Sequence, residues 1–308
     1  QELIKTTVGE KGADANRISS AKALAAHLLY TLKIENLTLT PGLRYENITL
    51  TRMDYGTDDP NRTGQDLAIR ENNVNVWIPG IGANYRFNNY ISVFGGVHKG
   101  FSPPSNTPGQ NAEESINYEL GSRFGFKGFS GELVGFYNDY QNLLGSDLAA
   151  TGGTGSLDQF NAGEVRVSGL ELLLNYNLLY NTSEKFKLPL SISYTLTDTE
   201  FLTSFDSNED IYGVVTKGDE IPYIAKNQLN ATLGLQHKKF EVNLNSRYTG
   251  AFRTKAGSGP IPENFKVDSN FIVDLSAHYF LNENFMLSTN IINLFDTKYA
   301  VSRVPAGL

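Results

Sequence analysis

The side chains of this sequence that could do chemistry are single ionisable residues set into strand-like segments, and they form no catalytic motif. The chain has no cysteine, no His-x-x-x-His pair, no Ser-His-Asp arrangement and no glycine-rich phosphate loop opening a helix. We therefore expect no enzymatic reaction, no cofactor and no metal ion held by the protein itself.

Nine ionisable residues share one place in the local pattern, in the middle of a segment and on its polar side. They are Arg44, Glu46, Glu119, Arg123, Glu171, Glu241, Arg247, Asp274 and His278. An unpaired charge in a sealed interior costs several kcal/mol. The pattern therefore favours an interior that is hydrated or filled by a second polar body.

The segments that position these residues alternate apolar and polar side chains with the period of a β-strand. In the segment 188–197, for example, Leu190, Ile192 and Tyr194 alternate with Ser191 and Ser193. Several segments exceed the usual 5–6 residues of a soluble strand. The expected strands are Lys22–Leu32, Leu37–Met53, Asn73–Phe87, Tyr90–Lys99, Ser115–Phe126, Phe129–Tyr140, Gly163–Tyr176, Leu188–Thr197, Gln228–Gln236, Phe240–Tyr248, Val267–Leu281 and Phe285–Phe295.

Composition and length narrow the class of protein. The 308 residues show no composition shift or linker, so we expect one all-β domain over residues 1–308. Hydrophobic residues make up 40%, aromatics 11% and charged residues 19%, which is low in charge and rich in aromatics for a soluble domain. A net charge of -7 argues against nucleic-acid binding. Because no stretch approaches roughly 18 apolar residues, a membrane protein would have to cross with strands of about 9–11 residues.

Connections between the segments alternate between short and long. Short turns are expected at Glu35-Asn36, Asn88-Asn89, Lys127-Gly128, Asn181–Glu184, His237–Lys239 and Asn282–Asn284. Long connections are expected at Tyr55–Asn72, Phe101–Ala112, Leu144–Ala162, Phe201–Tyr223 and Ala251–Lys266, with little apolar content for a core of their own. All tight turns would then lie at one end of an antiparallel up-and-down sheet, as in membrane β-barrels.

Aromatic residues flank the short turns, among them Tyr30, Tyr85, Phe126, Phe186 and Tyr279. A row of such rings at one end of a barrel would form an interfacial girdle. The ordinary β-propensity of Tyr and Phe is the alternative. Alternation alone also fits a soluble sandwich, although a sandwich predicts loops of similar length at both ends.

Six motifs, in order, resemble the later part of a TonB-dependent outer-membrane receptor, most closely the ferric-citrate receptor group. They are Gly96–Pro104, Glu114–Gly121, Phe136–Tyr140, Gly163–Glu171, Gly218–Tyr223 and Asn293–Tyr299. The tandem prolines Pro103-Pro104 would end a strand at the outer rim because they cannot donate to a sheet. Gly169 and Glu171 would face the lumen, where the glycine leaves room for a plug domain or relieves strand curvature.

The resemblance implies about 12 strands of a 22-stranded barrel in the outer membrane of a Gram-negative bacterium, near strands 10 to 21. It implies uptake of a ferric chelate such as ferric citrate or a siderophore, energised by a TonB-type coupler that engages a segment outside this chain. Lipid and lipopolysaccharide would surround the barrel. No plug precedes the first strand, and the sequence stops at Pro305–Leu308 before a closing strand, so we expect a partial barrel from a longer protein.

An anionic chelate would need cations at the outer mouth, with arginine favoured for carboxylates. The outer-rim candidates are Arg52, Arg70, Lys99, Arg166, Arg253 and Lys255, each of which also has an ordinary interpretation as a solvated or lipopolysaccharide-facing charge. The candidates facing the lumen or plug are Arg44, Glu119, Arg123, Glu171, Arg247 and Asp274. We expect His98 and His278 to be hydrogen-bonded structural residues on the lumen side.

Other classes stay open from sequence. A passive porin shares the barrel without the receptor motifs. An outer-membrane enzyme or an autotransporter pore of twelve strands would close on an aromatic residue.

Overall fold

The computed structural model describes residues 16–56, 58–65, 67–105, 108–146, 159–161, 163–207 and 210–303. Most of the expected connection Leu144–Ala162 and the C-terminal Pro305–Leu308 lie outside these residues. The main strands are long and share one antiparallel sheet. They are β1 (Arg17–Leu29), β3 (Leu37–Asp54), β4 (Ala68–Arg86), β5 (Ile91–Ser102), β6 (Glu113–Phe126), β7 (Phe129–Gln141), β10 (Val165–Asn177), β12 (Pro189–Phe201), β15 (Asn227–His237), β16 (Phe240–Thr249), β19 (Asn270–Phe280) and β20 (Met286–Ile291).

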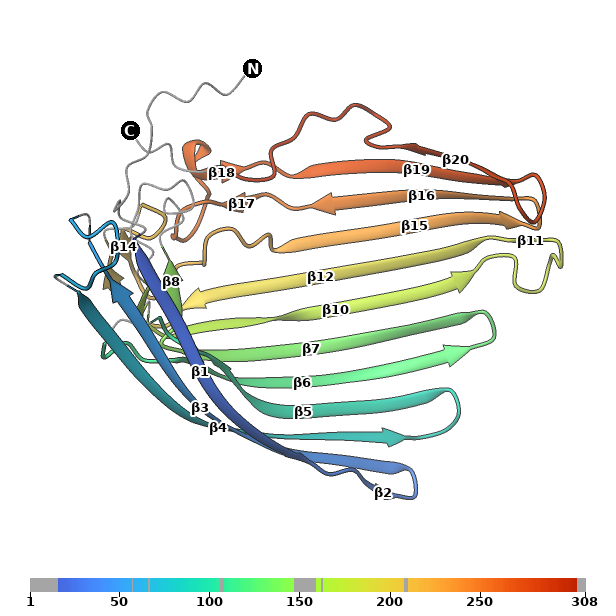
Figure 1. Ribbon diagram of the computed structural model, residues 1–308. Helices are drawn as coiled ribbons and strands as arrows, with labels where there is room; N and C mark the ends of the chain where they lie inside the picture. Colours follow the sequence, from blue (N-terminus) through green and yellow to red (C-terminus); the bar gives the residue numbers. More distant parts are fainter. Residues whose placement is uncertain are drawn as a thin grey trace.

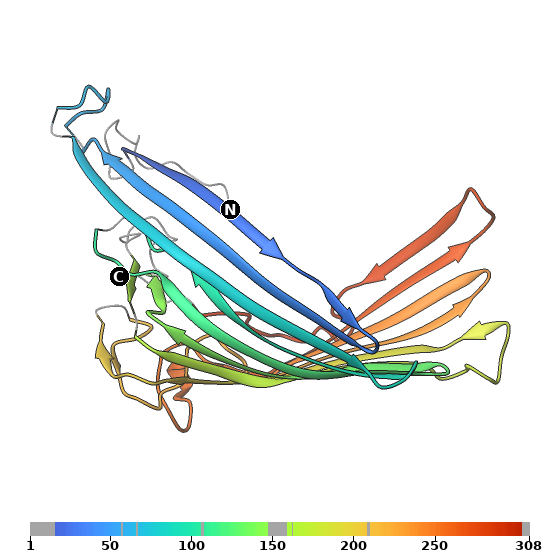
Figure 2. The same ribbon diagram turned by 90° about the horizontal axis from the view of Figure 1, so that it is seen from below.

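These strands pair in the order in which they occur in the chain, each antiparallel to the next. The short strands β2 (Leu32–Ile34) and β11 (Phe186–Lys187) extend the sheet at its turns. The sheet twists and curves into an open trough, with all tight turns at one end and all long connections at the other (Figures 1 and 2). We call these the turn end and the loop end. The all-β, antiparallel, up-and-down fold class is confirmed.

Short side chains and amides make the turns, as the sequence indicates. At Lys127-Gly128 the glycine has φ +74°, a left-handed conformation that favours glycine. The Asn88 Oδ1 atom accepts bonds from the Tyr90 and Ile91 amides, and Asn282 Oδ1 does the same for Asn284 and Phe285. These local bonds reverse the chain within a few residues, and the short turns are confirmed.

Pairing register sorts the side chains into two faces, because residues directly opposite in an antiparallel pair project to the same side. Arg44 lies opposite Ile78, Glu171 opposite Val134, and Asn245 opposite Asp274. All nine predicted mid-strand ionisable residues fall on this side, which we call the polar face. The other side, the apolar face, carries exposed Trp77, Ile81, Leu120, Leu133, Leu170 and Leu233.

Several expected boundaries were wrong at the loop end, among them the start of β1, at Arg17 rather than Lys22, and the end of β12, at Phe201 rather than Thr197. The segment 68–72 belongs to β4 rather than to the preceding loop, and β19 begins at Asn270 rather than Val267. The last strand ends at Ile291 rather than Phe295, because Asn293 and Asp296 have φ values of +54° and +50°. Strand β10 begins at Val165, after Gly163 with φ +79°. Strand β5 runs to Ser102, beyond the expected end at Lys99, and stops directly before Pro103, in agreement with the role expected of the tandem prolines.

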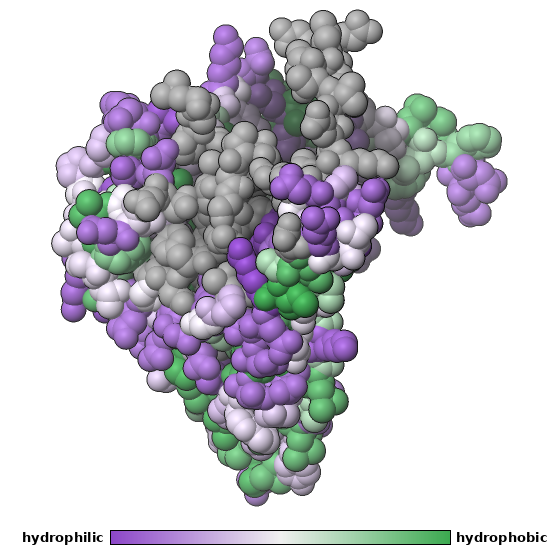
Figure 3. Space-filling model, turned by 60° about the vertical axis from the view of Figure 1, so that its left-hand side comes forward, coloured by the Kyte–Doolittle hydropathy of each residue, from purple (hydrophilic) through white to green (hydrophobic). Residues whose placement is uncertain are grey.

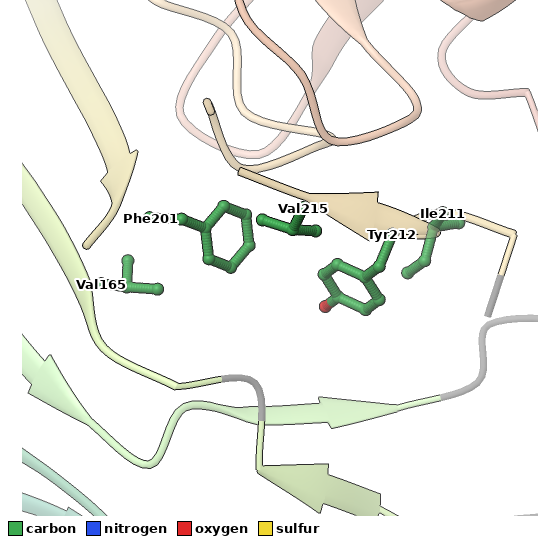
Figure 4. Close-up of a cluster of buried hydrophobic side chains, with 5 residues drawn as sticks. All are labelled: Val165, Phe201, Ile211, Tyr212 and Val215. Atoms are coloured by element: carbon green, nitrogen blue, oxygen red, sulfur yellow. The ribbon is translucent and has the colours of Figure 1, made fainter. Parts of the chain in front are cut away.

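The long connections were expected to lack a core, and this was wrong. Val165, Phe201, Ile211, Tyr212 and Val215 form a buried cluster at the loop end, with their side chains directed toward one another (Figure 4). The short hairpins β13 (Phe205–Asp206) with β14 (Val214–Val215) and β17 (Phe252–Arg253) with β18 (Lys266–Val267) fold over this region. A further hairpin pairs β8 (Leu144–Ser146) with β9 (Gln159–Asn161), and a 3₁₀ turn spans Glu263–Phe265.

Candidate functional site: the polar face and the loop end

Ion pairs hold two of the predicted polar-face arginines. The Arg44 guanidinium lies 2.5 Å from the Glu46 carboxylate on the same strand. Arg123 on β6 lies 2.5 Å from Glu132 on β7 and 3.9 Å from the centre of the Phe94 ring. These contacts fix both guanidinium groups against the wall of the sheet.

Two predicted carboxylates, Glu119 and Glu171, remain available on the same face. Both side chains are exposed, and neither forms an ion pair or hydrogen bond with the described residues. They line a recess of about 320 Å³ together with Arg123, Glu132 and Asn138. Three carboxylates and one guanidinium give this recess a net negative charge, which suits a cationic or hydrogen-bond-donating partner.

The two histidines and Asp274 have different surroundings. His278 Nδ1 lies 3.0 Å from Ser288 Oγ, which confirms the expected hydrogen-bonded histidine. His98 faces the same side but has no hydrogen bond to the described residues. The Asp274 carboxylate accepts the Asn293 amide at 2.7 Å and so anchors the turn of the Asn293–Tyr299 motif. Within the described part of the chain, no three His, Asp or Glu side chains are placed to hold a metal ion.

At the loop end, Arg52 and Arg70 come together on the polar face, directly opposite each other on β3 and β4. Arg52 Nε lies 2.8 Å from Asp54 Oδ1, and Arg70 Nε lies 3.8 Å from Asp54 Oδ2. The Asp54 carboxylate therefore lies close to both guanidinium groups at this rim.

Lys99 and Arg166 lie on the apolar face, away from the two rim arginines. Lys99 lies opposite Ile116, Ile116 opposite Asp139, and Asp139 opposite Arg166. These residues therefore form one row across four neighbouring strands. Lys99 binds Glu114 at 2.7 Å, and Arg166 binds Glu200. These paired charges form a band across the apolar face near the loop end.

Arg253 and Lys255 lie in the connection between β16 and β19, in different environments. The Arg253 side chain is 4% exposed and binds Glu220 Oε2 at 2.6 Å and the Gly259 carbonyl at 3.0 Å. Arg253 therefore links the β12–β15 connection to its own connection, and its guanidinium is already engaged in internal contacts. The Lys255 ammonium is partly exposed, 5.4 Å from the centre of the Phe265 ring. Only Lys255 of the two can reach a solute without breaking internal contacts.

Known proteins share this arrangement. The family model described as "TonB dependent receptor-like, beta-barrel" matches residues 4–294, nearly the whole chain. The chain belongs to this family of TonB-dependent receptor barrels.

Curated relatives of this receptor-family chain include two receptors for ferric enterobactin and the vitamin B12 transporter BtuB of Photobacterium profundum, which is 22% identical over 202 residues, or 64% of this chain and 28% of that protein. The chain is 24% identical over 298 residues to the ferric enterobactin receptor PirA of Pseudomonas aeruginosa, covering 84% of this chain and 35% of that protein. It is 27% identical over 198 residues to the ferrienterobactin receptor of Escherichia coli K12, covering 61% of this chain and 24% of that protein. The chain thus spans about a third or less of the length of these relatives.

Solved structures support the fold of the family. The siderophore receptor PiuA from Acinetobacter baumannii superposes with a TM-score of 0.70 at 20% identity, over 93% of this chain and 40% of that one. The ferric citrate transporter FecA, in its unliganded form, superposes with a TM-score of 0.70 at 18% identity, over 92% of this chain and 42% of that one. Enterobactin and citrate receptors both match, so the family is shown and the ferric-citrate group is not singled out.

The receptor motif at Gly169-Leu170-Glu171 has a packing role that sequence did not reveal. Gly169 lies opposite Phe136 and Thr197 on the polar face, as predicted. A Cβ atom there would lie 2.7 Å from the Phe136 ring and would collide with the Leu196 carbonyl. The absence of a side chain is therefore required by packing within the wall itself.

Sequence reasoning missed the acidic partners of this receptor's arginines. Asp54, Glu132, Glu200 and Glu220 were not singled out, although each binds a candidate cation. Glu132 could have been found by aligning the strands across the Lys127-Gly128 turn, which places it opposite Arg123. Glu220 could not, because its partner Arg253 is 33 residues away in another connection.

The loop end of this receptor-family chain is hydrophilic on its surface. Figure 3 brings that end forward and shows mainly hydrophilic side chains there, with hydrophobic ones gathered toward the lower part of the view. No helix in the described ranges is long and apolar enough to span a membrane.

Proposed function

We propose that this chain is the wall of an outer-membrane receptor that takes up a ferric chelate, such as ferric citrate or a siderophore, with energy supplied by a TonB-type coupler. The whole receptor would reside in the outer membrane of a Gram-negative bacterium, surrounded by lipid and lipopolysaccharide. It would be a transporter and not an enzyme. The observation that carries the proposal is the two-faced sheet, charged on one side and apolar on the other, in a chain of this family.

Cation placement supports an anionic cargo. Arg52 and Arg70 both contact Asp54 on the polar face at the loop end, and Lys255 lies in the β16–β19 connection at the same end of the sheet. A solute entering from that end would first meet their positive charge. We propose these three residues, rather than Lys99 and Arg166, as cargo contacts. Arg253 would act by holding its connection in place.

We further propose that the chain is one part, residues 1–308, of a longer receptor whose plug domain and coupling segment lie outside it. Glu119 and Glu171 are exposed carboxylates without partners among the described residues, in an acidic recess on the polar face. Charged groups in such a place need a polar partner or water. A plug domain in the trough would supply one.

Growth and uptake experiments test the function. A strain lacking the complete receptor is complemented with it and supplied with ⁵⁵Fe as citrate or as siderophore complexes. We expect uptake of at least one chelate, abolished by a protonophore while surface binding persists. An uptake rate that the protonophore leaves unchanged indicates a passive pore and contradicts the proposal.

Variants at the loop end test the cargo site. Lys255→Ala is expected to weaken equilibrium binding of an anionic chelate about threefold to tenfold, as loss of one exposed charge contact would. Lys238→Ala, in a turn at the opposite end, is the matched control and should bind normally. Unchanged affinity in Lys255→Ala removes this residue from the site.

A further inference from the structure

One part of the polar face is almost free of charge. On β12 and β15 every residue of this face is neutral, and hydroxyl and amide groups predominate. They are Pro189, Ser191, Ser193, Thr195, Thr197, Thr199, Gln228, Asn230, Thr232, Gly234 and Gln236. With the polar face of β16 they form a surface that we call the neutral wall.

Two charged residues lie on the β16 part of this wall, and they differ in their partners. The Glu241 carboxylate accepts bonds from Gln236 Nε2 at 3.4 Å and Asn243 Nδ2 at 3.0 Å. Arg247 is exposed and forms no hydrogen bond or ion pair with the described residues. Its directly opposite neighbours are Asn230 and the buried Ile272, neither of which can neutralise it.

Arg247 also differs from the four other candidate arginines on the polar face. Arg44 and Arg123 are held by carboxylates, and Arg52 and Arg70 share Asp54. The carboxylate nearest in register to Arg247, Asp274, accepts the Asn293 amide instead. A guanidinium with five donors and no acceptor in the described part of the chain is suited to an anion from outside the chain.

The neutral wall continues from Arg247 to the turn end, where it borders a recess of about 520 Å³. Polar-face residues lining this recess include Asn175, Ser191, Thr232, Gln236 and Asn243. Hydroxyl and amide groups can hydrogen-bond a polar solute while contributing no net charge to hold it. A solute could therefore exchange contacts along this surface from one end of the strands to the other.

We propose that the neutral wall is the lane along which an anionic solute passes through the lumen, and that Arg247 is its anion-binding contact. The inference rests on the proposed function in one respect, namely that a solute crosses this lumen. The acidic recess, with Glu119, Glu132 and Glu171, borders the neutral wall where Glu171 lies opposite Thr195, and it would repel the same solute toward β15 and β16.

The first test measures local potential and needs no knowledge of the cargo. This chain has no cysteine. The substitution Asn230→Cys, made in the complete receptor, therefore places a single thiol in this part of the receptor, next to Arg247. We expect an anionic thiosulfonate to react faster there than a cationic one, with the rate ratio falling about threefold or more in Asn230→Cys/Arg247→Gln. Asn117→Cys on β6 is the control position, where Arg247→Gln should leave the ratio unchanged. An unchanged ratio at residue 230, or no reaction there, overturns the proposal.

The second test measures transport. Arg247→Gln is expected to lower the uptake rate of an anionic ferric chelate severalfold while leaving surface binding and the uptake of an uncharged chelate unchanged, and Arg247→Lys should retain most uptake. Equal loss for charged and uncharged chelates overturns the role of charge. If the unaltered receptor takes up no chelate, the proposed function fails, while the thiol-reactivity ratio still decides whether Arg247 attracts anions.

Discussion

The two ends of the sheet treat apolar side chains in opposite ways. At the turn end, rings such as Tyr85, Phe126 and Phe285 are exposed, the last at 66%. At the loop end Phe201 is fully buried at 0%, within a cluster supplied by three connected segments. The same kinds of residue are thus left on the surface at one end and enclosed at the other.

This difference indicates which medium each end meets. Leaving apolar ring surface in water costs about 25 cal/mol of free energy per Å² relative to burying it. This cost disappears for a ring that lies in the interfacial region of a bilayer. At the loop end the long connections instead bury their apolar side chains against one another. The contrast therefore supports the proposed placement of the turn end at a membrane interface. The contrast predicts a different response to mutation at each place.

The largest expected effect is at the loop end. Phe201→Ala should remove about 3–5 kcal/mol from the local stability of the packed connections, because a fully buried ring is lost and a cavity is left. Hydrogen exchange of segment 199–225 should accelerate while the strands stay protected. Val214→Ala, at a site 77% exposed, is the control. Unaltered protection in Phe201→Ala contradicts a packed loop core.

A smaller effect is expected on the wall itself. Leu120→Arg, on the apolar face at a site 67% exposed, should destabilise the complete receptor in bilayers by about 2–4 kcal/mol, because a charge enters the lipid. Asn230→Arg, on the polar face, should cost much less. Denaturant unfolding in phospholipid vesicles measures both variants. Equal costs on the two faces would mean that the apolar face does not contact lipid.

The smallest effect concerns pH at the tip of the β3–β4 connection. Hydrogen bonds from the Thr63 amide, then from Gly64 and the Thr63 hydroxyl, hold the pKa of Asp59 below its ordinary value, although burial opposes the shift. Ionised Asp59 therefore stabilises this loop above the ordinary carboxyl pKa, and the contribution is lost as pH falls through the lowered value. Amide exchange at Thr63 and Gly64 should accelerate in acid. Asp59→Asn should abolish that pH dependence, and an identical acid response in this variant would exclude Asp59 as the cause.

Much of the wall could be predicted from sequence because its determinants are local. Period-two alternation placed Arg44, Glu171 and Asp274 on one face, and the register confirms it. Turn residues such as Asn88 and Gly128 act within four residues of themselves. The loop core escaped prediction because Val165, Phe201 and Val215 come from separate segments, and no local pattern marks them as neighbours.

Sequence by itself determined the strands, their order, the short turns and the two faces, since each depends on residues a few positions apart. Only the tertiary structure decided which cations are available. It pairs Arg253 with Glu220 across two connections, places Lys99 beside Glu114 and Arg166 beside Glu200, and leaves Arg247 without a partner among the described residues. The charge on each side chain is a property of its type, whereas the group that neutralises it is brought near by long-range pairing of the chain.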